Sequence, residues 1–172
     1  TRGAPTVDDG LLYAMNANGD LVCVTADKGE KKWALSLVED FGGGIPGWGY
    51  SESPLIDGNK LIVTPGGAQG AIVALDKKTG KAIWQSKDLK DGAQYSSVIV
   101  ADVKGKRQYI QLFMKTLAGV DAETGDVLWT SKWPGRTAVI PTPIYSDGHV
   151  YISSGYGVGS KLVDITGGEA KD

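Results

Sequence analysis

The stretch Val120-Asp121-Ala122-Glu123-Thr124-Gly125-Asp126-Val127-Leu128-Trp129 returns along the chain as a repeat. A copy at residues 75–84 keeps the same Asp, Thr, Gly and Trp, and 45 residues separate its Trp from Trp129. A weaker copy ending at Trp33 keeps only Gly and Trp, and a fourth begins at Val163 and has no Trp. A repeat of roughly 40 to 50 residues is typical of a propeller blade or of a unit of a helical solenoid.

The hydrophobic pattern around the repeat distinguishes these two architectures. Each copy follows two short runs of β-branched or aromatic residues, divided by Asp-Gly or glycine-rich turns. Nowhere do apolar residues recur at helical spacing over a dozen positions. The pattern therefore predicts an all-β fold, a β-propeller built from four-stranded antiparallel blades.

The spacing of the repeats gives about four blades in one propeller segment that covers residues 1–172. We expect the blades at approximately residues 1–37, 50–90, 94–132 and 138–172, and the fourth lacks a clear outermost strand. The chain has 25 glycines, about twice the usual share of roughly 7%, and they lie between apolar runs. Such glycines are typical of many tight turns, and therefore of many short strands.

Composition and charge argue against several classes of function. Lys and Arg total 18 against 20 for Asp and Glu, and neither sign forms a run, so no nucleic-acid surface is predicted. The apolar runs are far shorter than the about 18 residues of a membrane span. Cys23 is the only cysteine and His149 the only histidine, so a cysteine-based zinc site or a multi-histidine centre is not predicted.

The repeated motif has a structural explanation. Its Asp and Thr accept backbone N–H bonds in the turn from third to fourth strand, and its Gly adopts a positive φ. The Trp lies on the outer strand, where a large aromatic side chain is best explained by packing on the neighbouring blade. We call this set the docking motif: Asp76, Thr79, Gly80, Trp84, Asp121, Thr124, Gly125, Trp129, Gly29 and Trp33. Trp48 lacks the spacing to a glycine and is predicted to lie outside it.

The docking motif resembles that of the pyrroloquinoline-quinone-type β-propellers. This family includes quinoprotein alcohol dehydrogenases, polyvinyl-alcohol-dehydrogenase-like proteins and the non-catalytic lipoprotein of outer-membrane protein assembly. The resemblance covers essentially the whole chain, although the first copy has Thr25 in place of Asp and Lys28 in place of Thr. It implies a periplasmic or otherwise extracytoplasmic location. It also implies that four blades are a partial ring, half of an eight-bladed propeller.

Under this resemblance, an enzyme would hold pyrroloquinoline quinone and calcium, with an Asp base close to the cofactor. No residue here can be assigned to these roles, and the adjacent cysteine pair typical of the enzymes is missing. We therefore expect a non-catalytic binding or scaffold module with no catalytic residue, metal or cofactor. One alternative is a fragment of a pyrroloquinoline-quinone- and calcium-dependent alcohol dehydrogenase, of the polyvinyl-alcohol type. A second is an extracytoplasmic sensor domain.

The longest loops are predicted to share one face of the propeller, which we call the long-loop face: residues 38–49, 66–70, 87–95, 114–115, 132–140 and 155–159. Aromatic and Arg residues on loops are favoured at binding hot spots. The candidates for contacting a protein partner or a small-molecule ligand are Trp48, Tyr50, Tyr95, Lys115, Arg136 and Tyr156. The alternative is that Trp48 and Tyr50 only fill the space under the glycine-rich loop.

A partial ring leaves an apolar blade face open at each end, and such patches are rare on monomers. We therefore expect self-association that closes the propeller, in which the first blade of each copy packs on the fourth blade of the other. The alternative is that further blades of a longer parent chain close the ring. The missing strand of the fourth blade either comes from residues 1–4 of the partner or is absent.

Overall fold

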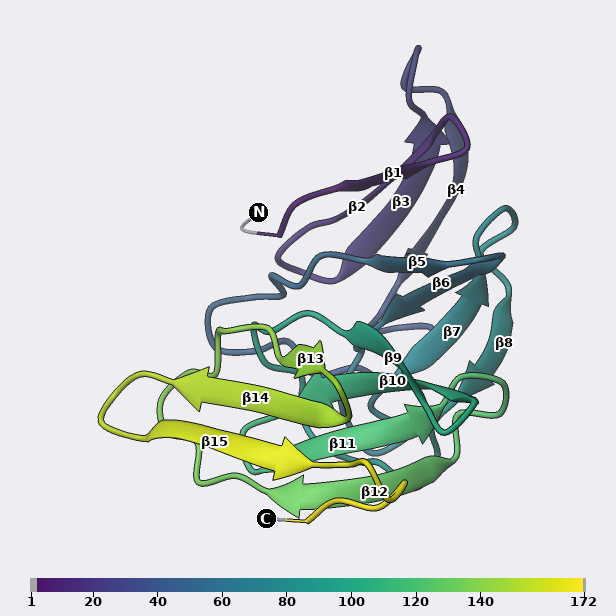
Figure 1. Cartoon of the computed structure of the whole chain (residues 1–172). Helices are drawn as coiled ribbons and strands as arrows, with labels where there is room; N and C mark the ends of the chain where they lie inside the picture. The colour runs from purple at the N-terminus through teal and green to yellow at the C-terminus, as the bar shows by residue number, and fades with distance from the viewer. Residues whose placement is uncertain (1–2, 172) are drawn as a thin grey trace.

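A computed structural model describes residues 3–171. Within this range the chain forms four antiparallel sheets and no helix, and the sheets follow one another along the chain (Figure 1). The purple sheet at the top of Figure 1 is the first blade, and the yellow-green sheet at the bottom left is the fourth. No helix of the described residues is long and apolar enough to cross a membrane.

Among the described residues, three blades have four strands and the fourth has three, each strand pairing with the next one along the chain. The strands are β1 (Thr6–Asp8), β2 (Leu11–Met15), β3 (Asp20–Thr25) and β4 (Lys31–Ser36) in blade 1; β5 (Leu55–Asp57), β6 (Lys60–Val63), β7 (Val73–Asp76) and β8 (Ala82–Gln85) in blade 2; β9 (Ile99–Val103), β10 (Lys106–Leu112), β11 (Thr116–Asp121) and β12 (Val127–Lys132) in blade 3; and β13 (Ile144–Ser146), β14 (His149–Ser154) and β15 (Gly159–Asp164) in blade 4.

Tight hairpin turns follow the Asp-Gly signals of the sequence. The turn from β1 to β2 has Asp9 and Gly10 at φ values of 47° and 74°, and the turn from β13 to β14 has Asp147 and Gly148 at 47° and 77°. Both residues of such a two-residue turn need positive φ, which Asp tolerates and Gly adopts freely.

The hydrophobic core lies between the blades. Because side chains alternate along a strand, each inner blade presents one apolar set to each neighbour. In blade 2, Leu61 and Leu75 face blade 1, whereas Ile62 and Ala74 face blade 3. All four side chains are fully buried. A third cluster, which includes Ile110 and Val150, fills the space between blades 3 and 4.

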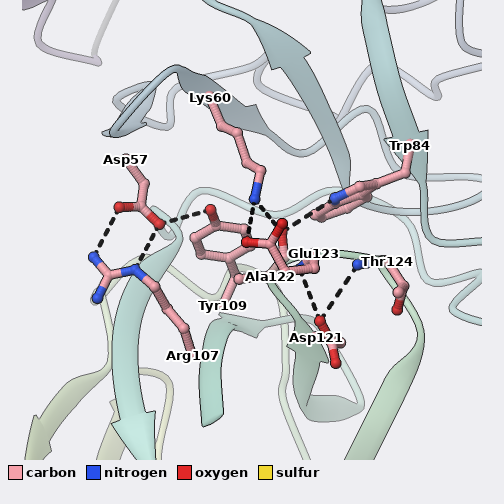
Figure 2. A network of polar contacts seen from close by, with 9 residues as sticks. All are labelled: Asp57, Lys60, Trp84, Arg107, Tyr109, Asp121, Ala122, Glu123 and Thr124. Carbon is pink, nitrogen blue, oxygen red and sulfur yellow. Dashed lines mark hydrogen bonds and ion pairs between the residues drawn. The ribbon is translucent and has the colours of Figure 1, made fainter. Parts of the chain in front are cut away.

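Trp33 and Trp84 reach the turn of the next blade, as the docking motif predicts. The indole N–H of Trp33 donates to the carbonyl oxygen of Lys77 at 3.1 Å, and that of Trp84 donates to Ala122 at 3.2 Å (Figure 2). The two rings cover Gly80 and Gly125, whose φ values are 73° and 78°.

The Asp and Thr of the docking motif hold its turn. Asp76 Oδ1 accepts the backbone N–H of Thr79 and the Thr79 hydroxyl, each at 2.8 Å. Asp121 Oδ1 likewise accepts the backbone N–H groups of Glu123 at 2.7 Å and Thr124 at 3.3 Å (Figure 2). These bonds lower the pKa of Asp76 below its ordinary value, because Thr79 donates twice to its carboxylate.

Trp129 is buried in the cluster between blades 3 and 4, as the docking motif predicts, but its hydrogen bond differs from those of Trp33 and Trp84. Its indole N–H donates to Gln108 Oε1 at 2.6 Å, and its ring covers Gly119, both in its own blade. Gly119 lies opposite Trp129 in the sheet, at the position that Cys23 and Ala74 hold opposite the other two tryptophans. Because Gly119 has no Cβ, the Trp129 ring can cover it; an added Cβ would lie 2.3 Å from the ring atom Cε2.

The fourth blade has no full outer strand among the described residues. A single bridge joins Asp164 to Lys171 at the edge of β15. The proposed donor, residues 1–4 of a partner copy, is only partly described, since Thr1 and Arg2 lie outside the described residues. Gly3 lies against the backbone of Glu52, and Ala4 donates its N–H to Ser53 Oγ at 3.0 Å. These contacts within its own chain argue against a strand exchange.

Candidate binding site on the long-loop face

Hydrogen bonds tie several loops of the long-loop face to one another. The backbone N–H of Trp48 donates to the Tyr95 hydroxyl at 3.2 Å, and the Tyr95 N–H donates to the carbonyl of Val139 at 3.0 Å. The N–H of Gly67 donates to the carbonyl of Asp91 at 2.9 Å. Loops from three successive blade connections are therefore held in fixed relative positions.

A hollow of about 420 Å³ opens among these loops, and we call it the aromatic hollow. Its lining residues are Trp48, Ser51, Tyr95, Ala138, Ile140 and Tyr156. Trp48, Ile140 and Tyr156 are each more than half exposed. Trp48 and Tyr95 form an aromatic pair, with ring centroids 5.9 Å apart and planes inclined by 60°. Such a pair is worth about 0.5–1.5 kcal/mol beyond burial, so it helps to fix the exposed indole.

A second hollow of about 710 Å³, the cationic groove, has three positive side chains on its wall. Lys115, Lys132 and Arg136 line it together with Thr116, Trp133, Pro134 and Gly135. All three cations are exposed. The backbone N–H of Trp133 donates to the carbonyl of Lys115 at 2.8 Å and joins the two walls. The connection from β12 to β13 contributes to both the groove and the aromatic hollow.

Five of the six candidate residues line one of the two hollows. Trp48, Tyr95 and Tyr156 line the aromatic hollow, and Lys115 and Arg136 line the cationic groove.

Tyr50 does not belong to the exposed surface, which is a correction. Its side chain is 2% exposed and its hydroxyl donates to the carbonyl of Pro65 at 2.7 Å. Its backbone N–H donates to the carbonyl of Ala17 at 2.9 Å, which directs the ring into the core between blades 1 and 2. Tyr50 therefore fills space under the loop, as the alternative interpretation held, whereas Trp48 does not.

A buried polar cluster lies next along the chain to two lining residues, because Glu52 follows Ser51 and Ser96 follows Tyr95. The backbone N–H of Thr64 donates to the Glu52 carboxylate, and Gln111 Nε2 donates to Thr64 Oγ1 at 2.8 Å. Ser96 donates its hydroxyl to Gln111 Oε1 at 2.8 Å. Burial raises the pKa of Glu52 to about 7. The cluster joins blades 2 and 3 beneath the loops.

A second polar network joins blades 2 and 3 at the opposite ends of the strands (Figure 2). Arg107 donates to both carboxylate oxygens of Asp57, at 2.8 and 2.7 Å, and the Tyr109 hydroxyl donates to Asp57 at 2.8 Å. The bonds from Arg107 hold the pKa of Asp57 below its ordinary value. Lys60 donates to the carbonyl of Ala122 at 2.9 Å and to the carboxylate of Glu123 at 2.6 Å. These partners satisfy one another, so the network serves the junction between the blades.

No quinone and calcium site can be assigned among the described residues. Within residues 3–171, no three or more His, Cys, Asp or Glu side chains gather so that they could hold a metal ion. Cys23 is fully buried in the core between blades 1 and 2, away from the long-loop face. No residues can therefore be named as ligands of the cofactor, and no chemical step through it can be assigned.

Antiparallel sheets that pack face to face in chain order, with long loops gathered at one end, define a β-propeller. The chain belongs to the propeller family described as "Outer membrane protein assembly factor BamB", whose family model matches residues 1–171. The protein of that name from Francisella salina is 31% identical over 105 residues, which is 59% of this chain and 18% of that protein. The matched part is thus less than a fifth of that relative.

Solved structures confirm the β-propeller fold. BamB from Moraxella catarrhalis superimposes with a TM-score of 0.66 at 20% identity, over 98% of this chain and 48% of that one. A quinohemoprotein alcohol dehydrogenase from Comamonas testosteroni superimposes with a TM-score of 0.68 at 17% identity, over 99% of this chain and 34% of that one. The four blades therefore correspond to about half or less of these longer chains.

Proposed function

We propose that this chain is a non-catalytic binding module that takes an apolar side chain of a protein partner into the aromatic hollow. The observation that carries the proposal is the gathering of three exposed apolar side chains, Trp48, Ile140 and Tyr156, around one hollow. Interface hot spots favour aromatic residues clustered around pockets. Loops held on a rigid scaffold are the usual site of recognition.

The size and order of the aromatic hollow suit this role. Its volume lies within the ~300–1,000 Å³ that is usual for ligand pockets. Because Tyr95 joins the loop of Trp48 to that of Val139, two walls are ordered before a partner arrives. Order that exists before binding reduces the entropy lost on association.

The neighbouring cationic groove defines the charge of the partner. Lys115, Lys132 and Arg136 favour an acidic segment beside the apolar anchor. The expected partner is thus a polypeptide with an aromatic or large aliphatic residue followed or preceded by Asp or Glu. Because the three cations are exposed, binding should weaken with ionic strength.

The family supports a location and a setting for this partner. Its members are named for the assembly of outer membrane proteins. We therefore place the chain in the periplasm, where its partner is a component or a substrate of that assembly. The likeness to a quinohemoprotein alcohol dehydrogenase supports the alternative of a dehydrogenase fragment only at the level of the fold. No feature of the described residues favours the sensor domain.

The test uses a phage-displayed library of random peptides selected on the purified chain. A selected peptide is then synthesised with a fluorescent label, and its affinity is measured by fluorescence anisotropy. The Trp48→Ala/Tyr156→Ala double variant should bind at least tenfold more weakly. Ile83→Ala is the matched control, because Ile83 is exposed on β8 and belongs to neither hollow.

Two further readouts separate the proposal from chance selection. The selected sequences should be enriched in aromatic and acidic residues, and raising the salt concentration should lower the affinity of the peptide for the chain. Peptides of no common chemistry, or binding that the double variant leaves unchanged, would contradict the proposal. Circular dichroism verifies that each variant is folded.

A further inference from the structure

The aromatic hollow and the cationic groove meet within the connection from β12 to β13. Arg136 lines the groove and Ala138 lines the hollow, so only Thr137 separates the two along the chain. Two residues of chain span at most about 7 Å, which limits the distance between the backbones of the two walls. The conformation of Thr137 therefore sets how the groove and the hollow lie relative to each other.

The backbone of Thr137 has a conformation that its own side chain disfavours. Its φ is 55°, in the left-handed region, where a β-branched residue is an outlier. The N–H of Ala138 donates to the carbonyl of Arg136 and closes a three-residue turn around Thr137. A turn of this kind with a positive φ at its centre is rare and strained. Such strain persists only where the surrounding structure imposes it.

The contacts of Thr137 itself do not explain the strain, but those of its neighbours do. Its side chain is exposed, and its hydroxyl makes no hydrogen bond to any residue that the structure describes. Before the turn, the Trp133 N–H donates to the carbonyl of Lys115 at 2.8 Å. Gly135 lies so close to the carbonyl of Met114 that a Cβ has no room there. The chain that leads into the turn is thus fixed on the turn from β10 to β11.

The chain that leaves the turn is fixed on a different loop, the one before β9. The carbonyl of Val139 accepts the Tyr95 N–H at 3.0 Å, and the N–H of Val139 donates to Gln94 Oε1 at 3.4 Å. Ala138 and Val139 are both buried. Thr137 therefore joins two segments whose positions are set independently, and its strained turn is the connection that fits both.

We infer that the turn at Thr137 makes the binding face specific for one spacing in the partner: an acidic residue two positions from the apolar anchor of an extended segment. The inference rests on the proposed function, because the anchor occupies the aromatic hollow and the acidic residue pairs with Arg136 in the cationic groove. Residues two apart in an extended segment point to the same side and lie about 6.5–7 Å from each other. This separation fits two walls whose backbones lie within about 7 Å.

Other spacings do not fit both walls at once. Adjacent residues of an extended segment point to opposite sides, and residues four apart are separated by about 13 Å. Arg136 is the cation that gives direction, because a guanidinium binds a carboxylate through two parallel hydrogen bonds, whereas an ammonium acts as a point charge. Arg136 is exposed and forms no ion pair with any described residue, so its guanidinium is free for a partner.

The test uses the labelled peptide selected on the purified chain. It is remade with its acidic residue one, two or four positions from its aromatic anchor, on either side, and each affinity is measured by fluorescence anisotropy. The two-position peptide should bind about fivefold more tightly than the others, the effect of one exposed ion pair. High salt should reduce the difference, since exposed charges are screened. Arg136→Ala should remove it.

Two substitutions at Thr137 separate the turn from the residue. Proline fixes φ near −65°, so Thr137→Pro removes the turn and should make the affinities of the three peptides equal. Glycine adopts positive φ freely, so Thr137→Gly keeps the turn and the preference, and raises the urea midpoint because the strain is relieved. Lys104→Gly is the matched control: Lys104 has a φ of 51° in the turn from β9 to β10, far from Arg136 along the chain. This control should leave the preference unchanged.

The opposite results overturn the inference. Equal affinities of the three peptides for the unchanged chain, or a preference for another spacing, would exclude it, and so would a folded Thr137→Pro variant that keeps the preference. A lower urea midpoint for Thr137→Gly would contradict the strain. If the Trp48→Ala/Tyr156→Ala variant still weakens binding in these cases, only the spacing is wrong.

If that double variant binds normally, or no peptide is selected, the proposed function fails and the inference fails with it. Circular dichroism shows whether each variant is folded. If Thr137→Pro does not fold, Arg136→Ala decides, because its exposed side chain can be removed without changing the turn. An Arg136→Ala chain that keeps the preference would then overturn the inference.

Discussion

Replacing Gly125 by Ala tests how the blades are held together. The ring of Trp84 covers Gly125, and an added Cβ would lie 2.5 Å from the Trp84 ring atom Cε3. Gly29 offers a matched control, because it holds the same place in the first repeat, has a φ of 69° against 78°, and has no atom within 4 Å of an added Cβ. Only Gly125→Ala therefore displaces a docked indole.

The magnitudes follow from these two differences. Gly29→Ala should cost about 1–2 kcal/mol of unfolding free energy, the penalty for placing an L-residue in the left-handed region. Gly125→Ala pays this penalty and also displaces Trp84, which adds about 1–3 kcal/mol of overpacking. The displaced indole also loses its bond to the carbonyl of Ala122, worth about 1 kcal/mol.

A double-mutant cycle isolates the docking term. In a Trp84→Ala background, the Gly125→Ala change should cost no more than Gly29→Ala does, because there is no ring to displace. Urea unfolding is followed by far-ultraviolet circular dichroism at one fixed protein concentration, since self-association would otherwise change the apparent stability. Equal costs for the two glycine variants, or a cost of Gly125→Ala that the Trp84→Ala background leaves unchanged, would refute the docking of Trp84.

Three further predictions concern other parts of the chain. Trp129→Ala should cost about 3–5 kcal/mol of unfolding free energy, as for large core aromatics, and Trp48→Ala far less; the reverse order in urea melts would be inconsistent with their burial. Burial raises the pKa of Glu52 from 4.5 to about 7, so the folded chain holds a proton that the unfolded chain releases. Stability should therefore fall by about 3 kcal/mol as the pH rises from 4.5 to 7, and Glu52→Gln should remove this fall; an unchanged pH profile would exclude the protonated carboxyl. Equilibrium dialysis with pyrroloquinoline quinone and calcium should show no stoichiometric retention; retention with dye reduction by an alcohol would support the dehydrogenase.

The fold could be predicted from the sequence because its signals are local. The turn residues Asp9 and Gly10 are adjacent, and the Asp, Thr and Gly of the docking motif lie within five residues. Each blade is a run of hairpins, so neighbours in sequence are also neighbours in the sheet. What the motif did not predict is the contact of the Trp129 ring with its own blade, which depends on Gly119, the residue opposite it on β11. A sequence pattern within one strand does not contain that pairing.

The site was only partly predictable because it depends on contacts between distant segments. Trp48 and Tyr50 are both aromatic and lie two residues apart in the same glycine-rich segment, so the sequence does not distinguish them. The backbone N–H of Tyr50 bonds to the carbonyl of Ala17, and only the Tyr50 side chain lies in the core. Ile140 was missed because it looks like an ordinary apolar loop residue. The loop of Ile140 is held beside that of Trp48 through Tyr95, which bonds to Trp48 and to the carbonyl of Val139. Tyr95 and Val139 lie 44 residues apart in the sequence.

Hydrogen exchange of the chain with and without a selected peptide tests the binding surface most directly. If the aromatic hollow is the binding site, bound peptide should slow amide exchange in the loops that line it, at residues 44–51, 93–97, 136–141 and 155–159. The amide of Trp48, bonded to the Tyr95 hydroxyl, should be among those slowed. Protection confined to the outer strands β4, β8 and β12, with these loops unchanged, would contradict the account.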